Sequence, residues 1–365
     1  MITCFIGTRA QLIKMAPVIL EIERRKLDLN LVFTGQHKET MEQLVSDFGI
    51  RTRAIYLYQG REITGITQMA KWFLACLWKA LRHPDAFVPK TAPPNIMLVH
   101  GDTFSTLLGA VVGRLKGIPV AHIEAGLRSH NVFHPFPEEL TRLIVFRLSR
   151  VAFCPGPWAY DNMRRYRSIR IDTGHNTLRD AIEIAKAAPP KADPGLTAGD
   201  YGICSIHRFE NIFDRKRLAK ILALVEKAAA RYRLLFVLHP ATRKKLEQFG
   251  FMSRLEANPK IKLLPRMGYV EFVQLMQRAR FVVTDGGGNQ EELSYLGIPT
   301  LLMRKATERR EGLGSTAILG GYDEGVMEFF LAGLDNKAPT PTSDLAAGTA
   351  LPSRQIVDYI ESLQS

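Results

Sequence analysis

Blocks of apolar and polar residues divide the chain into predicted strands and helices. In the first half, short continuous apolar runs are typical of strands buried on both faces of a sheet. They cover residues 2–6, 31–33, 96–99, 120–123 and 151–153. Between them, apolar residues recur at helical spacing over residues 11–25, 41–48 and 106–115. This alternation predicts an α/β fold with a parallel sheet covered by helices on both faces.

The same alternation starts again in the second half. Predicted strands cover residues 201–206, 234–238, 261–264, 281–283 and 300–303, and a last helix covers 355–363. A chain of 365 residues is too long for one ordinary core. We therefore expect one domain over residues 1–178 and another over 179–350. We expect the segment 351–365 to form a C-terminal helix that packs back on the first domain.

One predicted helix, residues 72–81, is rich in large apolar side chains. Such a helix could lie on a membrane or on a partner, but a core-facing helix is more common. No apolar run reaches the roughly 18 residues that span a bilayer. Residues 1–6 run directly into the first predicted strand without a basic leader. We therefore expect a cytoplasmic protein without a transmembrane segment.

The net charge of +13 makes acidic partners plausible, including nucleic acid, an anionic membrane and phosphorylated metabolites. The basic residues are dispersed, and no aromatic–basic pattern suggests stacking on single strands. We therefore expect no nucleic-acid binding. The four cysteines, Cys4, Cys76, Cys154 and Cys204, are scattered and form no CxxC pair. Neither a zinc site nor a disulfide framework is indicated, and we expect reduced, buried thiols.

Polar residues gather where predicted strands of the first half end. Asp102 follows the strand 96–99, and Glu124 follows the strand 120–123. Glu138 and Glu139 open the next predicted helix. Ligands of open α/β sheets bind outside the carboxyl ends of strands, so these carboxylates suggest acid/base chemistry on a polar substrate. For Glu138 and Glu139 the alternative is that they only favour a helix N-terminus.

Basic residues accompany these carboxylates. Arg128 lies between Glu124 and Glu138 in the sequence, and Arg9 and Lys14 lie near the glycine turn after the first strand. That turn opens a helix, whose N-terminus can receive an anion. Arg9 and Lys14 therefore strengthen the prediction of a phosphate or sugar site.

The second half carries a glycine-rich strand exit, residues 285–292, which opens a helix. Gly287 and Gly288 let backbone N–H groups approach a phosphate, and Glu292 could accept from ribose hydroxyls. The alternative is a purely structural turn. His207 follows the strand 201–206, where it either binds the ligand or only caps its own strand. These features, with the carboxylates of the first half, fit a nucleotide sugar held between two domains.

No Walker pattern and no dinucleotide fingerprint occur in the sequence, so ATP-dependent and nicotinamide chemistry are disfavoured. We expect neither a cofactor nor a metal ion. The expected partner is a small phosphorylated sugar substrate.

Seven motifs in order carry a resemblance to a known family. They are Gly7-Thr-Arg-x-x-x-Ile-Lys-Met-Ala-Pro17, Thr34-Gly-Gln-His37, Val99-His-Gly-Asp-Thr103, His122-x-Glu-Ala-Gly-Leu-Arg128, Pro135-x-Pro-Glu-Glu139, His207-Arg-x-Glu-Asn211 and Asp285-x-Gly-Gly-x-Gln-Glu-Glu292. Over about residues 1–320 the chain resembles the UDP-N-acetylglucosamine 2-epimerase family. The resemblance implies two Rossmann-like domains in the glycosyltransferase-B arrangement with an interdomain cleft. It also implies a homodimer and inversion at sugar C-2 without NAD or metal.

The reaction implied by the resemblance is anti-elimination of UDP through a 2-acetamidoglucal intermediate, followed by readdition. Carboxylates would stabilise the oxocarbenium-like cation and move the C-2 proton. By motif, the implied catalytic residues are Asp102, Glu124, Glu138 and His207. Which carboxylate is the base stays open. The implied UDP-sugar contacts are Arg9, Lys14, Arg128, His207, Gly287, Gly288 and Glu292.

The sequence departs from the family pattern at several positions. Ala10-Gln-Leu12 replaces the usual Pro-Glu-Ala, and Gly286 replaces the usual serine. Residues 239–243 resemble a branch that includes enzymes acting on modified UDP-hexosamines, such as 2,3-diacetamido uronic acids. Gln36, His37 and Gln43 match part of the allosteric site of some members. The alternatives left open are a hydrolysing 2-epimerase, a glycosyltransferase of the same fold and a non-catalytic sensor.

Overall fold

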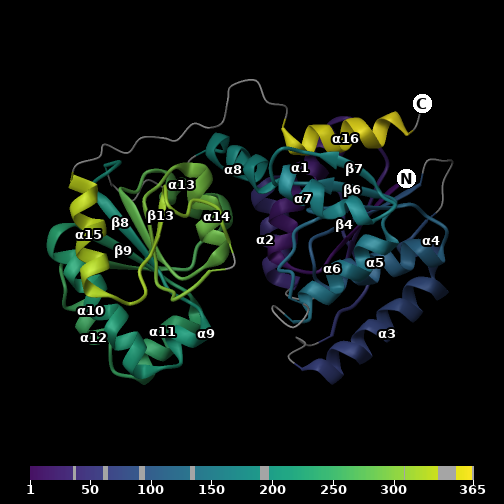
Figure 1. Ribbon diagram of the computed structural model, residues 1–365. Coiled ribbons are helices and arrows are strands. Elements are labelled where there is room, and N and C mark those ends of the chain that lie inside the picture. Colours follow the sequence, from purple (N-terminus) through teal and green to yellow (C-terminus); the bar gives the residue numbers. More distant parts are fainter. Residues whose placement is uncertain are drawn as a thin grey trace. The chain divides into compact units, whose positions relative to one another are not determined.

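The computed structural model describes residues 1–35, 38–60, 65–89, 95–131, 136–189, 197–307, 309–335 and 351–363. The chain forms two compact units (Figure 1). Unit 1 contains Met1–Ile184 and Ala350–Ser365, and unit 2 contains Ala185–Thr349. The predicted class, α/β with two Rossmann-like domains, is confirmed. The boundary expected after residue 178 falls at the start of helix α8 (Leu178–Ala187), and the contacts divide the chain within that helix.

Unit 1 is built on a seven-stranded parallel sheet in the order β3-β2-β1-β4-β5-β6-β7. Its strands are β1 (Ile2–Ile6), β2 (Leu29–Phe33), β3 (Ile55–Tyr56), β4 (Ile96–His100), β5 (Val120–Ile123), β6 (Val151–Cys154) and β7 (Ile169–Asp172). β1, β4, β5 and β6 are buried along their whole length, which explains their continuous apolar runs. The sequence did not predict β3 and β7, because these edge strands are partly exposed and mixed in composition.

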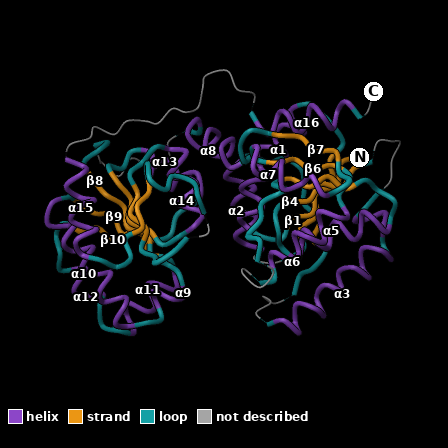
Figure 2. The backbone as a smooth tube through the Cα atoms, viewed as in Figure 1, coloured by secondary structure: helices purple, strands orange, loops and turns teal. Residues whose placement is uncertain are grey.

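Helices cover both faces of this sheet, which Figure 2 shows as an orange layer between purple elements. They are α1 (Arg9–Arg24), α2 (Lys38–Phe48), α3 (Ile66–Arg82), α4 (Pro84–Phe87), α5 (Phe104–Leu115), α6 (Glu138–Leu148), α7 (Pro157–Asn162) with the 3₁₀ turn η1 (Met163–Arg165), α8 and α16 (Pro352–Ser362). α16 packs against α1, where Arg25 forms ion pairs with Asp358 and Glu361. The C-terminal segment therefore completes unit 1.

Helix α3 buries one side and exposes the other. Trp72 and Cys76 belong to the core of unit 1, whereas the side chains of Leu74 and Trp78 are 65% and 63% exposed. In the described parts of the chain, no helix is long and apolar enough to cross a membrane. α3 is therefore an amphipathic helix with one side facing the core. Two large apolar residues, Leu74 and Trp78, lie on its exposed side.

Unit 2 repeats the architecture with a six-stranded parallel sheet in the order β10-β9-β8-β11-β12-β13. The strands are β8 (Tyr201–Ser205), β9 (Arg233–Leu238), β10 (Ile261–Pro265), β11 (Phe281–Thr284), β12 (Thr300–Leu302) and β13 (Ala317–Leu319). The helices are α9 (Phe209–Ile212), α10 (Arg215–Arg231), α11 (Pro240–Gln248), α12 (Met252–Glu256), α13 (Tyr269–Gln277), α14 (Gly287–Leu296) and α15 (Glu324–Asp335). Strand order reverses beside β8 and β11, so their exits form the switch point where such sheets bind ligands.

All four cysteines are buried and free. Burial raises the pKa of the Cys4 thiol to about 12, which keeps it protonated and unreactive. The cysteines therefore belong to the cores of the units.

Candidate active site

The sheet order of unit 1 brings the predicted strand exits together. β4 lies between β1 and β5, so Gly7–Arg9, Gly101–Thr103 and the residues from Glu124 onward leave the sheet at one edge. A pocket of about 250 Å³ opens there, and its lining includes both Asp102 and Glu138. The full lining is Thr8, Met69, Trp72, Asp102, Thr103, Phe104, Ser105, Pro137 and Glu138. Two of the predicted carboxylates therefore face one cavity, and Glu124 lies at the adjacent strand exit.

Glu124 has an unusual backbone and a crowded carboxylate. Its φ of 65° lies in the left-handed region, which non-glycine residues rarely adopt and which often marks a functional site. Its Oε1 pairs with Lys14 Nζ and accepts a hydrogen bond from Asn176 Nδ2. Its Oε2 lies 3.5 Å from His100 Nε2. The structure therefore places Lys14, predicted as a ligand contact, against a carboxylate of its own unit.

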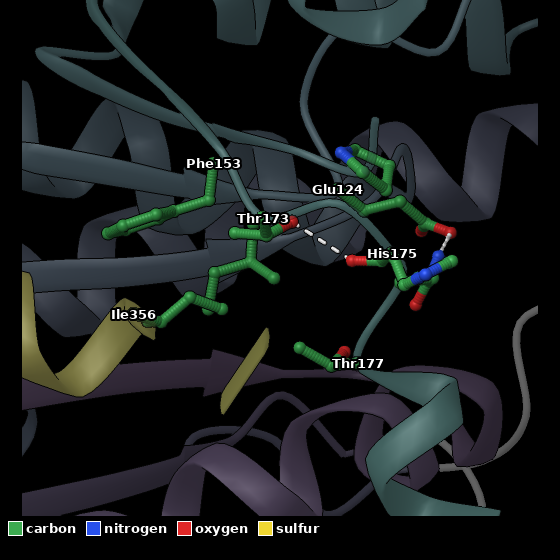
Figure 3. Close-up of a pocket in the computed structure, with 9 residues that line it drawn as sticks. Glu124, Phe153, Thr173, His175, Thr177 and Ile356 are labelled. Carbon is green, nitrogen blue, oxygen red and sulfur yellow. Dashed lines mark hydrogen bonds between the residues drawn. The ribbon is translucent and has the colours of Figure 1, made fainter. Parts of the chain in front are cut away.

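A second, very small cavity of about 10 Å³ includes Glu124 in its lining (Figure 3). The loop after β7 forms part of its wall, where Thr173 Oγ1 donates to the carbonyl oxygen of His175, 2.9 Å away. Phe153 and Ile356 form the apolar side of the wall. Asn176 belongs to this loop, so the β7 exit delivers a donor to Glu124 that sequence reasoning missed.

Asp102 and Glu139 are joined by an arginine that no motif indicated. Arg142 pairs with Asp102 and lies 3.2 Å from Glu139 Oε2. Glu139 is fully buried, and it also accepts from Arg128 Nε and from Ser129 N. Burial opposes the ionisation of Glu139, but these hydrogen bonds lower its pKa below the usual range. Arg128, another predicted ligand contact, is therefore held by Glu139.

The two glutamates that open α6 are thus different in kind. Glu138 borders the 250 Å³ pocket, whereas Glu139 points into the ion-pair network and stays there as an anion. Both stand in the first turn of α6, where negative charge is favourable. Stabilisation of the helix N-terminus would therefore explain both glutamates equally well. The two differ in that only Glu138 is among the residues that line the pocket.

The departure at position 11 has a structural explanation. The Gln11 side chain is buried, and its Oε1 accepts from Gly7 N at 2.9 Å and from Thr8 N at 3.2 Å. Its Nε2 donates to the carbonyl oxygen of His100 at 2.7 Å and to Thr106 Oγ1 at 2.9 Å. An amide can both accept and donate in this way, whereas a carboxylate can only accept. Gln11 therefore ties the β1 exit to the β4 exit.

Two buried histidines stand behind the carboxylates. His122 on β5 donates from Nε2 to the carbonyl oxygen of Gly101, 2.7 Å away, because a carbonyl can only accept. Burial lowers the pKa of both His100 and His122 to about 4. Both rings are therefore neutral near pH 7. His122 helps to fix the turn that presents Asp102.

In unit 2, Asp285 organises the exits of β8 and β11. This buried carboxylate accepts from His207 N at 3.0 Å, from Arg208 N at 2.9 Å and from Asn211 Nδ2 at 2.8 Å. The ring of His207 stays partly exposed, with Nδ1 3.4 Å from Asp285 Oδ1. The predicted His207 is thus presented at the switch point of this sheet by an acidic residue that the candidate site did not include.

The glycine-rich turn lies beside His207. Gly286 is the N-cap of α14 and makes no side-chain capping bond. A Cβ at Gly286 would lie 2.9 Å from His207 Cε1, whereas a Cβ at Gly288 would meet open space. The absence of the usual serine at position 286 therefore makes room for the His207 ring. Glu292, one turn further along α14, is buried.

Some predictions fall outside the described residues. Gln36, His37 and Pro135 are not described, so the motifs that contain them are tested only in part. Arg9 is described as the first residue of α1 and is partly exposed. Within the described ranges, no group of three histidine, cysteine, aspartate or glutamate side chains could hold a metal ion.

The sequence profile of the UDP-N-acetylglucosamine 2-epimerase family matches residues 20–328. The chain belongs to this family. The 2-epimerase of Methanococcus maripaludis is 32% identical over 332 residues, which cover 87% of this chain and 87% of that protein. The UDP-2,3-diacetamido-2,3-dideoxy-D-glucuronate 2-epimerase of Pseudomonas aeruginosa is 32% identical over an alignment of 376 positions, which covers 99% of each chain.

Solved 2-epimerases share the fold over their full length. The crystal structure of the Methanocaldococcus jannaschii UDP-GlcNAc 2-epimerase in complex with UDP-GlcNAc and UDP superposes with a TM-score of 0.76. The two chains are 26% identical, and the match covers 99% of each. The family resemblance read from the motifs is therefore confirmed.

Proposed function

We propose that this protein is a UDP-HexNAc 2-epimerase that inverts C-2 by anti-elimination and readdition of UDP. Membership of the 2-epimerase family supports the reaction class. The assignment of the active site rests on one observation: Asp102 and Glu138 line the same pocket, and Glu124 lies at the neighbouring strand exit. Carboxylates around one cavity fit a reaction that passes through a cationic sugar and moves a proton at C-2.

The chemistry divides the carboxylates by role. When the C-1–oxygen bond breaks, its electron pair leaves with UDP and positive charge develops on the sugar. A carboxylate then takes the C-2 proton, which gives the 2-acetamidoglucal. Asp102 and Glu124 are our candidates for this proton transfer or its support, and Glu138 is our candidate for the second face. Asp102 pairs with Arg142 and Glu124 pairs with Lys14, so each of these carboxylates has a cation beside it.

UDP is proposed to bind at the switch point of unit 2. The N-terminus of α14 offers backbone N–H groups at Gly287 and Gly288, and its dipole favours a phosphate. His207, anchored by Asp285, is proposed to bind the departing diphosphate. Glu292 is proposed to bind the ribose. In unit 1, Arg9, Lys14 and Arg128 are proposed to supply positive charge to the UDP-sugar.

The substrate is proposed to be UDP-GlcNAc or a UDP-HexNAc with further substituents. Relatives of similar identity carry both kinds of name, one for UDP-N-acetylglucosamine and one for UDP-2,3-diacetamido-2,3-dideoxy-D-glucuronate. The apolar part of the pocket, formed by Met69, Trp72 and Phe104, suits an N-acyl methyl group. We propose that this apolar wall receives an acetamido substituent.

The decisive experiment is proton NMR of the protein with UDP-GlcNAc and with a diacetamido UDP-sugar in heavy water. A non-hydrolysing epimerase incorporates deuterium at C-2 and keeps UDP attached in the products. Free N-acetylmannosamine and UDP would instead identify a hydrolysing 2-epimerase. Absence of C-2 exchange with every UDP-sugar, together with transfer to an added acceptor, would identify a glycosyltransferase and end the proposal.

We also propose that the protein is a homodimer. Leu74 and Trp78 on α3 and Leu140 and Ile144 on α6 are exposed, and both helices flank α5. An exposed apolar group of this kind is typical of a surface that another chain covers. Light scattering coupled to size exclusion should give twice the chain mass, and Trp78→Asp should shift it toward the monomer. A monomeric wild-type protein at micromolar concentration would contradict the proposal.

A further inference from the structure

His100 is a buried side chain that the proposed reaction does not use. It is the last residue of β4 and is 3% exposed. Neither Nδ1 nor Nε2 makes a hydrogen bond that meets ordinary geometry. Burying such a polar ring without full hydrogen bonding is unfavourable, so an apolar residue would suit a purely structural role better.

The surroundings of the ring indicate its role. Nε2 lies 3.5 Å from Glu124 Oε2, on the carboxylate oxygen opposite the one that Lys14 and Asn176 contact. The neighbouring Gly101 is close enough that a Cβ there would lie 3.2 Å from the same Oε2. Catalytic hydrogen bonds are often long in an enzyme without ligand and shorten in the reacting complex. A small movement of Glu124 would therefore complete a hydrogen bond from His100.

We propose that His100 is a positioning residue that donates a hydrogen bond from Nε2 to Glu124 and so sets the orientation and acidity of this carboxylate. The proposal rests on the proposed epimerase function of the same site. An ionised carboxylate only accepts hydrogen bonds, so Nε2 carries the proton of the neutral ring. The low pKa of His100, about 4 because of burial, keeps the ring a neutral donor in the working range.

The backbone of His100 is also fixed. Its carbonyl oxygen accepts from Gln11 Nε2 and from Thr106 Oγ1. These two hydrogen bonds hold the backbone of His100 in place and leave both ring nitrogens available to Glu124. The titratable and charged groups that face this pair are Lys14 on α1, Asp102 after β4, His122 on β5 and His175 after β7.

The consequence concerns the pKa of Glu124. A donor to the charged form of a carboxylate lowers its pKa, so removing the donor raises it. In the pH profile of kcat for C-2 exchange, the limb governed by Glu124 should move upward by about one pH unit in His100→Leu and His100→Met. At pH values below that limb, kcat should fall about tenfold while KM stays unchanged. His100→Gln, which keeps an amide donor near the position of Nε2, should restore most of the wild-type pH limb and most of kcat.

A measurement that needs no turnover tests the same point. The ¹³C signal of the Glu124 carboxyl, identified by its loss in Glu124→Gln, should titrate at higher pH in His100→Met than in wild type. His122→Gln is the matched control, since His122 is an equally buried histidine whose hydrogen bond goes to a backbone carbonyl. It should leave the titration of Glu124 close to that of wild type.

Two results would overturn the inference. One is an unchanged titration and pH profile in both His100→Leu and His100→Met, with only a loss of thermal stability. The other is a shift in His122→Gln as large as in His100→Met, which would assign the effect to loop packing. Failure of the proposed function is distinguishable, because wild type would then show no C-2 exchange, whereas the ¹³C titration would still report on His100.

Discussion

Gln11 on α1 donates a hydrogen bond from Nε2 to the carbonyl oxygen of His100, 2.7 Å away on the neighbouring β4. Its other end accepts from the backbone of Gly7 and Thr8. One buried side chain therefore sets the spacing between the turn that opens α1 and the turn that presents Asp102. The carboxylate that the family pattern has at this position would not reproduce these contacts in its ionised form.

Gln11→Glu should destabilise the protein by about 1–3 kcal/mol at pH 7, because a buried anion would face the carbonyl oxygen of His100 without a proton to donate. Urea unfolding at pH 7 measures the change. The loss should shrink at low pH, where the new carboxyl group is protonated and can donate. Equal stability of the two proteins at pH 7 would contradict the hydrogen-bond arrangement.

Glu124→Gln and Asp102→Asn should each lower turnover by about a hundredfold or more, because each removes a proposed acid/base group without removing volume. Calorimetry should show that UDP binding is largely kept, since the proposed UDP contacts lie mainly in unit 2. Loss of UDP binding in either variant would mean that these carboxylates bind the nucleotide.

The neighbouring glutamates of α6 should respond in opposite ways. Glu138→Gln should reduce kcat with little loss of stability, because Glu138 borders the pocket. Glu139→Gln should reduce stability by about 3–5 kcal/mol, since it leaves Arg128 and Arg142 without their buried anion. Thermal unfolding and steady-state rates, measured side by side, separate the two. The reverse pattern would exchange their roles.

Gly286→Ala should rotate the His207 ring, because the new methyl carbon would lie 2.9 Å from Cε1 while the backbone of His207 stays bonded to Asp285. We expect a changed histidine NMR signal and UDP affinity weaker by roughly tenfold, about 1.4 kcal/mol. Gly288→Ala is the control for the ring position, because a methyl group there meets no neighbour. An unmoved His207 signal in Gly286→Ala would refute the steric argument.

Asp180 should make the stability of unit 1 depend on pH. Burial raises its pKa from 3.8 to about 6, although Ser353 N donates to its Oδ2 at 2.6 Å. The folded protein therefore holds this proton more tightly than the unfolded chain. The resulting stabilisation is complete below about pH 4 and is lost as the pH rises through about 6.

Asp180→Asn should flatten this slope and raise stability at pH 7 by up to about 3 kcal/mol. The amide oxygen can still accept from Ser353. Urea unfolding at several pH values checks the slope. Identical slopes in the two proteins between pH 4 and 6 would show that Asp180 does not carry the effect.

The sequence predicts the buried strands of both sheets because they are apolar on both faces, as β1 and β11 illustrate. It misses β3, β7 and β13, which are short or partly exposed. Each of these strands is stabilised by hydrogen bonding to a neighbouring strand. A local pattern of apolar and polar residues does not predict such pairing.

The candidate site shows the same limit. Asp102 and Glu124 were found because acidic residues follow apolar strands. The sequence did not predict that Lys14 pairs with Glu124 and Arg128 with Glu139. A cation near a strand exit can pair either with a ligand phosphate or with a protein carboxylate, and the sequence pattern does not distinguish the two. Arg142 on α6 contacts Asp102, and Asn176 after β7 contacts Glu124. These residues are far apart in the sequence and are brought together by the order of the strands in the sheet. That order is a property of the fold.

The return of the chain to unit 1 through α16 constrains how the protein can be divided. A gene fragment ending near residue 184 would encode all seven strands of the first sheet but not the helix whose Asp358 and Glu361 neutralise Arg25. An exchange of simple N- and C-terminal pieces between relatives would therefore separate α16 from the parent of the unit it completes. A chimera that keeps these contacts carries α16 from the same parent as α1 and Arg25.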